Sequence, residues 1–219
     1  MSLSFQPENP FPYAPAGTPY AAEKAHASLV DAHLGLATEA TEKTIRPPPD
    51  GAERWLHVPV DTFLTPYTEL RRMLGEINPA PGARIVDLGA GYGRLGFVVQ
   101  AHSKARFLGL ELVPERVAAG ERALRAYGAD RAELRCADLA DPAFSPPPAD
   151  WYFVYDYGTR AAIEKTLRDL RALARGQIVR VAARGRAVRD AIERSHPWLG
   201  EVVEPRQHGN FTLYASSEG

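Results

Sequence analysis

The sequence predicts an α/β protein: a three-layer sandwich whose helices cover both faces of a mostly parallel, seven-stranded sheet. Short apolar runs alternate with amphipathic segments after Asp61, which is the pattern of βαβ units. The last two apolar runs, within residues 200–216, follow each other without a helix between them. They therefore predict an antiparallel hairpin at the end of the sheet.

Each expected element has its own local signal. The apolar runs predict strands over residues 84–89, 106–113, 132–139, 151–158 and 177–185. Apolar residues at helical spacing predict helices over residues 65–77, 94–103, 114–128, 159–176 and 186–199. The helix that starts at Pro114 has proline in its first turn and Gly128 at its end, which is the expected asymmetry.

The first 60 residues differ from the rest. They are rich in proline, and only residues 21–44 have the composition of a helix. The sequence therefore divides into an N-terminal arm, residues 1–60, and a domain, residues 61–219. The arm is a candidate lid over a site in the domain.

Composition narrows the function classes. The formal net charge is -1, which disfavours nucleic acid and anionic membrane surfaces as partners. The chain has no apolar run of membrane-spanning length and no secretory signal pattern, so we expect a cytoplasmic protein. Cys136 is the single cysteine, and the six histidines lack the spacing of metal ligands, so we expect no metal.

Two glycine signatures overlap in residues 84–100. Read from Gly91, "GYGRLG" fits the fingerprint of dinucleotide-binding proteins; read from Asp87, "DLGAGYG" fits the glycine loop of enzymes that bind S-adenosylmethionine (SAM). Glu111, about 20 residues later, could bind ribose hydroxyls in either case. The glycines alone do not separate the two cofactors.

Three other features favour SAM. Asp87 would repel the pyrophosphate of a dinucleotide, but it would attract the ammonium and sulfonium groups of SAM. Asp138 ends the third expected strand, where it could accept a hydrogen bond from an adenine amine. The chain also ends in a short hairpin, where a dehydrogenase usually has a further substrate domain.

Together, "VDLGAGYG", "LELVPERV", "RCADL" and the terminal hairpin resemble the class I, Rossmann-like SAM-dependent methyltransferases over about residues 62–216. The resemblance implies a methyltransferase with SAM as cofactor. It implies cofactor contacts from these positions: Asp87, Gly89, Ala90, Gly91, Gly93, Glu111, Leu112, Asp138 and Leu139. "FLTPYTELRRML" is similar to a segment of the non-SET protein-lysine methyltransferases, which adds Thr65 and Tyr67 to the implied contacts.

Asp156 and Tyr157 are the catalytic candidates, because they end the fourth expected strand, where the methyl group would be presented. Asp156 could take a proton from the acceptor and Tyr157 could orient it, while a structural hydrogen bond to the following helix is the alternative for Asp156. We expect a protein side chain or a small molecule as acceptor. An NAD(P)-dependent oxidoreductase and a non-catalytic SAM-binding module remain the competing interpretations.

Overall fold

The computed structural model describes residues 3–46, 56, 58–200 and 205–216. Its centre is a seven-stranded sheet with the order β3-β2-β1-β4-β5-β7-β6. The strands are β1 (Arg84–Leu88), β2 (Arg106–Glu111), β3 (Ala132–Cys136), β4 (Trp151–Tyr155), β5 (Arg180–Arg184), β6 (Arg206–His208) and β7 (Phe211–Ala215). The first five are parallel, and β7 is antiparallel to β5 and β6. The predicted fold class is confirmed.

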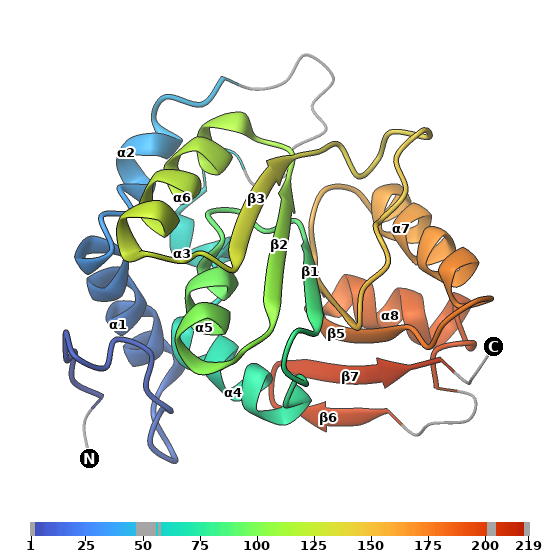
Figure 1. The fold of residues 1–219 in the computed structure, drawn as a ribbon, viewed down its shortest axis with the longest axis horizontal. Helices are drawn as coiled ribbons and strands as arrows, with labels where there is room; N and C mark the ends of the chain where they lie inside the picture. Colours follow the sequence, from blue (N-terminus) through green and yellow to red (C-terminus); the bar gives the residue numbers. More distant parts are fainter. Residues whose placement is uncertain (1–2, 47–55, 57, 201–204, 217–219) are drawn as a thin grey trace.

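The helices form the outer layers. They are α1 (Tyr20–His33), α2 (Thr38–Glu42), α3 (Val60–Phe63), α4 (Tyr67–Ile77), α5 (Arg94–His102), α6 (Pro114–Tyr127), α7 (Arg160–Leu173) and α8 (Arg186–Ser195). Figure 1 shows α4, α5 and α6 on one side of β1–β3, with α1 and α2 outside them, and α7 and α8 on the other side. Each side has its own hydrophobic cluster.

Successive side chains of β1 point to opposite faces of the sheet, so they pack alternately in the two clusters. Ile85 packs in the cluster beneath α4 and α5, whereas Val86 and Leu88 pack in the cluster beneath α7 and α8. Asp87 has the same parity as Ile85, so its side chain is on the face that the arm also covers. Because of this alternation, the Asp87 carboxylate lies on the side of the sheet that α4 and α5 cover.

The arm differs from the sequence prediction in one respect. The helix expected over residues 21–44 is two helices, because the chain turns after His33 and Gly35 has a φ of 71°. The short helix α3 was not predicted. Part of the proline-rich segment and the start of the first expected hairpin strand lie outside the described residues.

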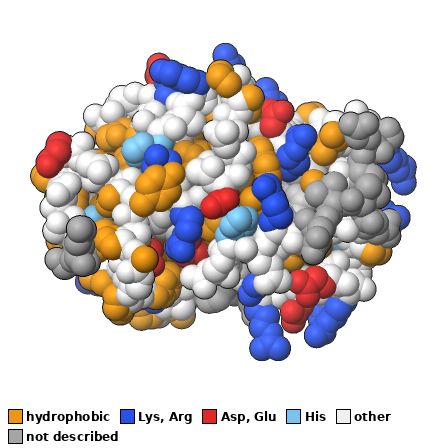
Figure 2. All heavy atoms as spheres, turned by 90° about the horizontal axis from the view of Figure 1, so that it is seen from below, with side chains coloured by type: hydrophobic (Ala, Val, Ile, Leu, Met, Phe, Trp, Pro, Cys, Tyr) orange, Lys and Arg blue, Asp and Glu red, His pale blue; other side chains and the backbone are white. Residues whose placement is uncertain are grey.

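The carboxyl ends of the parallel strands lie at one edge of the sheet, and β2 and β3 point toward the top of Figure 1. Figure 2 looks at the molecule from below, and apolar side chains gather there on the side of the arm. Two large apolar side chains of the arm, Tyr13 and Leu29, are more than half exposed, at 54% and 53%. No helix among the described residues is long and apolar enough to cross a membrane.

Candidate cofactor and active site

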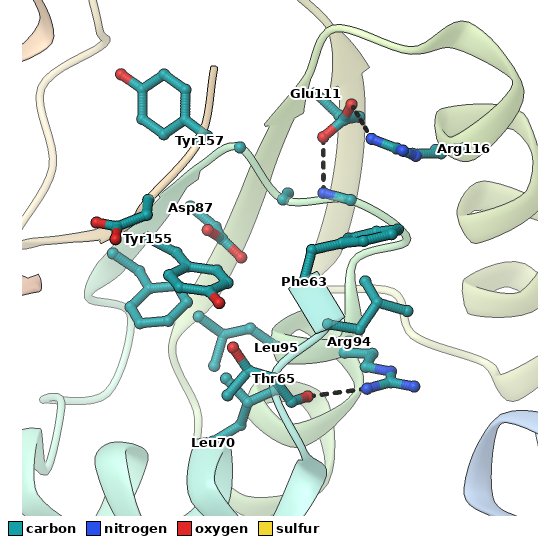
Figure 3. Close-up of a pocket in the computed structure, with 16 residues that line it drawn as sticks. Phe63, Thr65, Leu70, Asp87, Arg94, Leu95, Glu111, Arg116, Tyr155 and Tyr157 are labelled. Atoms are coloured by element: carbon teal, nitrogen blue, oxygen red, sulfur yellow. Dashed lines mark hydrogen bonds and ion pairs between the residues drawn. The ribbon is translucent and has the colours of Figure 1, made fainter. Parts of the chain in front are cut away.

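Two adjoining hollows lie at the carboxyl edge of the sheet. The first lies between the loop after β1, the end of β4 and the segment around α3, and Figure 3 shows its lining. The second lies between the ends of β2 and β3 and the start of α7. Both are lined by Gly89, Glu111 and Tyr157. Because they share these residues, one elongated ligand could occupy both.

The glycine loop forms the floor between the hollows. Gly89 has a φ of 92° and Gly91 a φ of 56°, a region that favours glycine. A Cβ atom on Gly89 would lie 3.0 Å from the Cβ atom of Tyr157, because the Tyr157 side chain packs on this glycine. Gly89, Ala90 and Gly91 all line the first hollow.

Gly93 has a packing role that was not predicted. It lines neither hollow and instead precedes α5, with a φ of 74°. A Cβ atom on Gly93 would lie 2.9 Å from a methyl carbon of Leu134. This glycine allows α5 to start close to β3, and its cofactor contact stays a prediction.

Asp87 is a buried carboxylate in the first hollow, only 4% exposed. Within the described part of the chain, no group donates a hydrogen bond to it. Burial raises the pKa of the Asp87 carboxyl well above its usual range, and repulsion from Glu111 raises this pKa further. A buried acid without a donor indicates a position for a cationic ligand or one that donates hydrogen bonds.

Glu111 ends β2 beside the glycine loop. One carboxylate oxygen accepts a hydrogen bond from the Gly91 N–H at 2.9 Å, and the other accepts one from the Val113 N–H at 3.0 Å. The guanidinium of Arg116 lies 3.5 Å from the second oxygen. Glu111 thus fixes the loop and faces both hollows, as a ribose-binding acid must.

The second hollow contains the remaining predicted residues of the nucleoside side. Leu112, Asp138 and Leu139 all line it. Asp138 also accepts a hydrogen bond from the Ala140 N–H at 2.8 Å, so it caps a turn while one oxygen stays available. The ends of the strands bring Asp138 to the same edge as Asp87, although the two residues are far apart in the sequence.

Thr65 and Tyr67, the two residues implied by the lysine-methyltransferase segment, lie in different surroundings. Thr65 lines the first hollow, as expected. Tyr67 lines neither hollow: it is fully buried, its ring packs 5.2 Å from that of Phe11, and its hydroxyl donates to Asp31 at 2.8 Å. The start of α4 directs the Tyr67 ring into the core beneath the arm, and the cofactor contact implied for Tyr67 stays a prediction.

Asp156 and Tyr157 line the first hollow, but protein groups already engage their polar atoms. The Asp156 oxygens accept hydrogen bonds from the backbone N–H groups of Val188 and Ala187 at 2.8 and 3.0 Å. They thereby cap the first turn of α8. The Tyr157 hydroxyl is hydrogen-bonded to that of Thr166. The catalytic roles of Asp156 and Tyr157 stay predictions, and the contacts favour the structural alternative left open for Asp156.

Sequence reasoning missed several residues of the first hollow. Phe153 and Tyr155 are two apart on β4 and therefore on the same face as each other, which is the signal that could have found them. Phe63 comes from α3. Arg116 follows Glu111 by five positions at the start of α6; only the fold shows that it turns back to the site. No group of three possible metal ligands is present among the described residues.

This architecture, with its glycine loop and acids at the strand ends, defines the fold of the class I SAM-dependent methyltransferases. Solved structures support the fold. TrmN from Thermus thermophilus is 19% identical, with a TM-score of 0.53 over 71% of this chain and 49% of its own. The protein yhhF of Escherichia coli, described as a putative methyltransferase, is also 19% identical, with a TM-score of 0.56 over 74% of this chain and 92% of its own.

A third solved structure was obtained with a cofactor product. The tRNA (uracil-54, C5)-methyltransferase of Pyrococcus abyssi, in complex with S-adenosyl-L-homocysteine, is 14% identical, with a TM-score of 0.51 over 71% of this chain and 40% of its own. The present chain thus spans about half of the TrmN chain and less of the Pyrococcus enzyme. No protein-family model and no curated protein matches the sequence.

Proposed function

We propose that this chain is a SAM-dependent methyltransferase whose acceptor is a protein side chain or a small molecule. The observation that carries the proposal is Asp87, a buried acid without a hydrogen-bond donor among the described residues, in a hollow beside the glycine loop. A ligand with an ammonium and a sulfonium group compensates this negative charge. A pyrophosphate would instead add to the repulsion between Asp87 and Glu111.

Different residues of the two hollows bind different parts of SAM in this proposal. Gly89 and Gly91 let the ligand approach the backbone, Asp87 attracts the cationic amino-acid portion, and Glu111 accepts hydrogen bonds from the ribose hydroxyls. Asp138 accepts a hydrogen bond from the adenine amine in the second hollow. This division is supported by the two hollows meeting at Gly89 and Glu111.

Bound SAM would supply a methyl group on a positively charged sulfur, which leaves as a neutral thioether in an in-line displacement. The chain's contribution is alignment of the acceptor in a site that excludes water. Phe63, Leu70 and Phe153 give the first hollow apolar walls for this purpose. A proton acceptor is needed only for an acceptor that must lose a proton, and Asp156 is the candidate.

The acceptor class rests on charge. The formal net charge of -1 supports a protein side chain or a small molecule over a polyanion. The Pyrococcus enzyme is named for a tRNA uracil, but this chain spans only 40% of that enzyme. The name of the Pyrococcus enzyme is therefore weak support for an RNA acceptor.

Calorimetric titration tests the proposed function. We expect SAM to bind and NADH not to bind. The variant Asp87→Asn should bind SAM about 10-fold or more weakly, since hydrogen bonds to charged groups contribute about 1.5–3 kcal/mol. Glu8→Gln, at an exposed position in the arm, is the control and should bind as the wild type does. Tight NADH binding without SAM binding would show that the oxidoreductase interpretation is correct.

A labelling experiment tests catalysis separately. Methyl-labelled SAM is incubated with the protein and a lysate of its source cell, and the products are separated by size. Label in macromolecules that protease releases indicates a protein acceptor, and label in the small-molecule fraction indicates a metabolite. SAM binding with no transferred label would favour the non-catalytic module.

A further inference from the structure

The N-terminal arm contacts the cofactor site through one buried arginine. Glu42 of α2 binds Arg116 of α6 with both carboxylate oxygens, at 2.8 Å to Nε and 3.1 Å to Nη2. The Tyr92 hydroxyl donates to Glu42 at 2.8 Å and helps to fix it. Figure 1 shows α2 beside α6, on the outside of the domain. Two residues 74 positions apart thus form a bidentate ion pair.

The other side of Arg116 faces the site itself. Its Nη1 atom lies 3.5 Å from a carboxylate oxygen of Glu111, and its guanidinium lies over the ring of Phe63, 4.7 Å from the centroid. Figure 3 shows Arg116 directed toward Glu111 at the rim of the first hollow. The side chains of Arg116, Glu42 and Glu111 are only 3%, 9% and 6% exposed, so water screens these charges poorly.

Among the described residues, Arg116 contacts two carboxylates, and the two contacts are unequal. Glu42 takes two short hydrogen bonds, and Glu111 keeps a longer ion pair at 3.5 Å. If Glu42 lost its charge, the guanidinium would be drawn fully onto Glu111. Arg116 would then occupy carboxylate lone pairs that a ribose needs for its hydroxyl groups.

We propose that Glu42 is a positioning residue for cofactor binding, which holds Arg116 away from Glu111 and keeps the ribose-binding carboxylate available. The proposal rests on the proposed function, because Glu111 is the ribose ligand only in a nucleoside-binding site. It also assigns the arm a role: the site is complete only when α2 is docked on α6. Binding of the cofactor and docking of the arm then favour each other.

The test is a set of four variants titrated with SAM by calorimetry, with circular dichroism melting to confirm that each one folds. Glu42→Gln keeps the size of the side chain and removes its charge; we expect at least about 10-fold weaker SAM binding. Glu39→Gln changes an exposed glutamate of the same helix and should stay within about 2-fold of the wild type. Glu42→Asp retains the charge at a shorter reach and should give an intermediate affinity.

The fourth variant separates positioning from general damage. In Glu42→Gln/Arg116→Gln, the guanidinium that competes with the ribose is absent, so SAM affinity should return to within about 3-fold of the wild type. Glu42→Gln alone leaves the Arg116 charge buried without this counter-ion, so restored stability contributes to the rescue in the double variant. The melting temperatures measure that contribution, and the inference requires SAM affinity to return by more than the regained stability explains. Wild-type affinity in Glu42→Gln, or a double variant that binds no better than Glu42→Gln, overturns the inference alone. Absence of SAM binding by the wild type overturns the proposed function and this inference with it. If Glu42→Gln does not fold, Glu42→Asp decides: weaker binding supports the inference and unchanged binding overturns it.

Discussion

The buried charge of Asp87 has two opposite consequences. It favours the proposed binding of SAM, but it lowers the stability of the folded protein. Its folded-state pKa is raised by burial and by Glu111, whereas in the unfolded chain the carboxyl titrates near 4. Between these two pKa values the folded protein binds more protons than the unfolded one. The Asp87 carboxyl therefore lowers the stability of the folded chain as pH rises through that window, and the penalty is complete above the folded pKa.

We predict that Asp87→Asn stabilises the protein at neutral pH. The neutral amide avoids the burial of a charge, and each kcal/mol gained should raise Tm by roughly 2–4 °C for a chain of this length. The gain should shrink as the pH falls and disappear below the unfolded pKa, where the wild-type carboxyl is protonated in both states. Urea denaturation at several pH values measures it. A variant that is less stable than the wild type at neutral pH would contradict the expectation that the buried Asp87 charge is destabilising.

The site residues that sequence reasoning identified share a simple physical property. Asp87, Glu111 and Asp138 each follow or end an apolar run, and the carboxyl ends of parallel strands meet at one edge. The burial of Tyr67 was not predictable, because the direction of its side chain depends on where α4 starts and on the arm that covers it. Arg116 and Glu42 were not predictable as a pair, since nothing local links positions 74 apart.

At the scale of elements, the periodic part of the chain was predictable and the arm was not. The five parallel strands, β7 and the five helices of residues 61–219 with strong apolar spacing are present in the structure. Strand β6 instead falls in residues 206–210, which the sequence predicted as the turn of the hairpin, and most of the expected first hairpin strand lies outside the described residues. In residues 21–44 the apolar spacing is weak, so the turn after His33 that separates α1 from α2 left no clear signal. The four-residue helix α3 is too short to have a periodicity.

The junction between β5 and α8 depends on a glycine that lies against Asp156, just after β4. Gly185 has a φ of 97°, and a Cβ atom there would lie 2.4 Å from the carboxyl carbon of Asp156. We predict that Gly185→Ala lowers the free energy of unfolding by at least about 1–2 kcal/mol, the cost of the left-handed backbone alone. Gly176→Ala is the control, because nothing lies within 4 Å of its added Cβ atom, and it should change stability by less than about 0.5 kcal/mol. Equal effects of the two substitutions in urea denaturation would contradict the prediction.

Two substitutions at Asp156 distinguish a helix cap from a base. Asp156→Ala removes both acceptors of the α8 N–H groups and should cost about 0.5–2 kcal/mol of stability. Asp156→Asn keeps one acceptor oxygen and should cost less. If Asp156 is a cap, Asp156→Asn should retain methyl transfer within about 3-fold. A loss of about 100-fold or more with normal SAM affinity would instead support the predicted general base.

The whole molecule joins the arm and the domain in one core. Apolar residues of the arm, including Phe11, Val30 and Leu36, belong to the same hydrophobic cluster as Ile85 of β1. Buried polar contacts add to this: Glu23 accepts a hydrogen bond from Thr68, and the Tyr20 hydroxyl accepts one from Arg184 at 2.6 Å. These contacts favour an arm that stays docked as a fixed wall of the domain, because an opening lid would have to break them.

The strongest of these attachments is the ion pair between Asp31 of α1 and Arg94 of α5. The side chains are 5% and 7% exposed, and Asp31 also accepts the hydrogen bond of Tyr67. We predict that Asp31→Asn costs about 3–5 kcal/mol, because it leaves the Arg94 charge buried without its counter-ion. Asp61→Asn, which breaks a surface pair with Lys24, is the control and should cost no more than about 1 kcal/mol.

The shape of the unfolding transition decides between a wall and a lid. If the arm and the domain are one cooperative unit, Asp31→Asn shifts a single transition, and circular dichroism and tryptophan fluorescence report the same midpoint. If the arm is a separable lid, the substitution releases it at low urea while the sheet unfolds near the wild-type midpoint, and two transitions appear. Since Arg94 also donates to the backbone carbonyl of Thr65 in the first hollow, at 3.0 Å, SAM affinity should fall together with stability in the one-unit case.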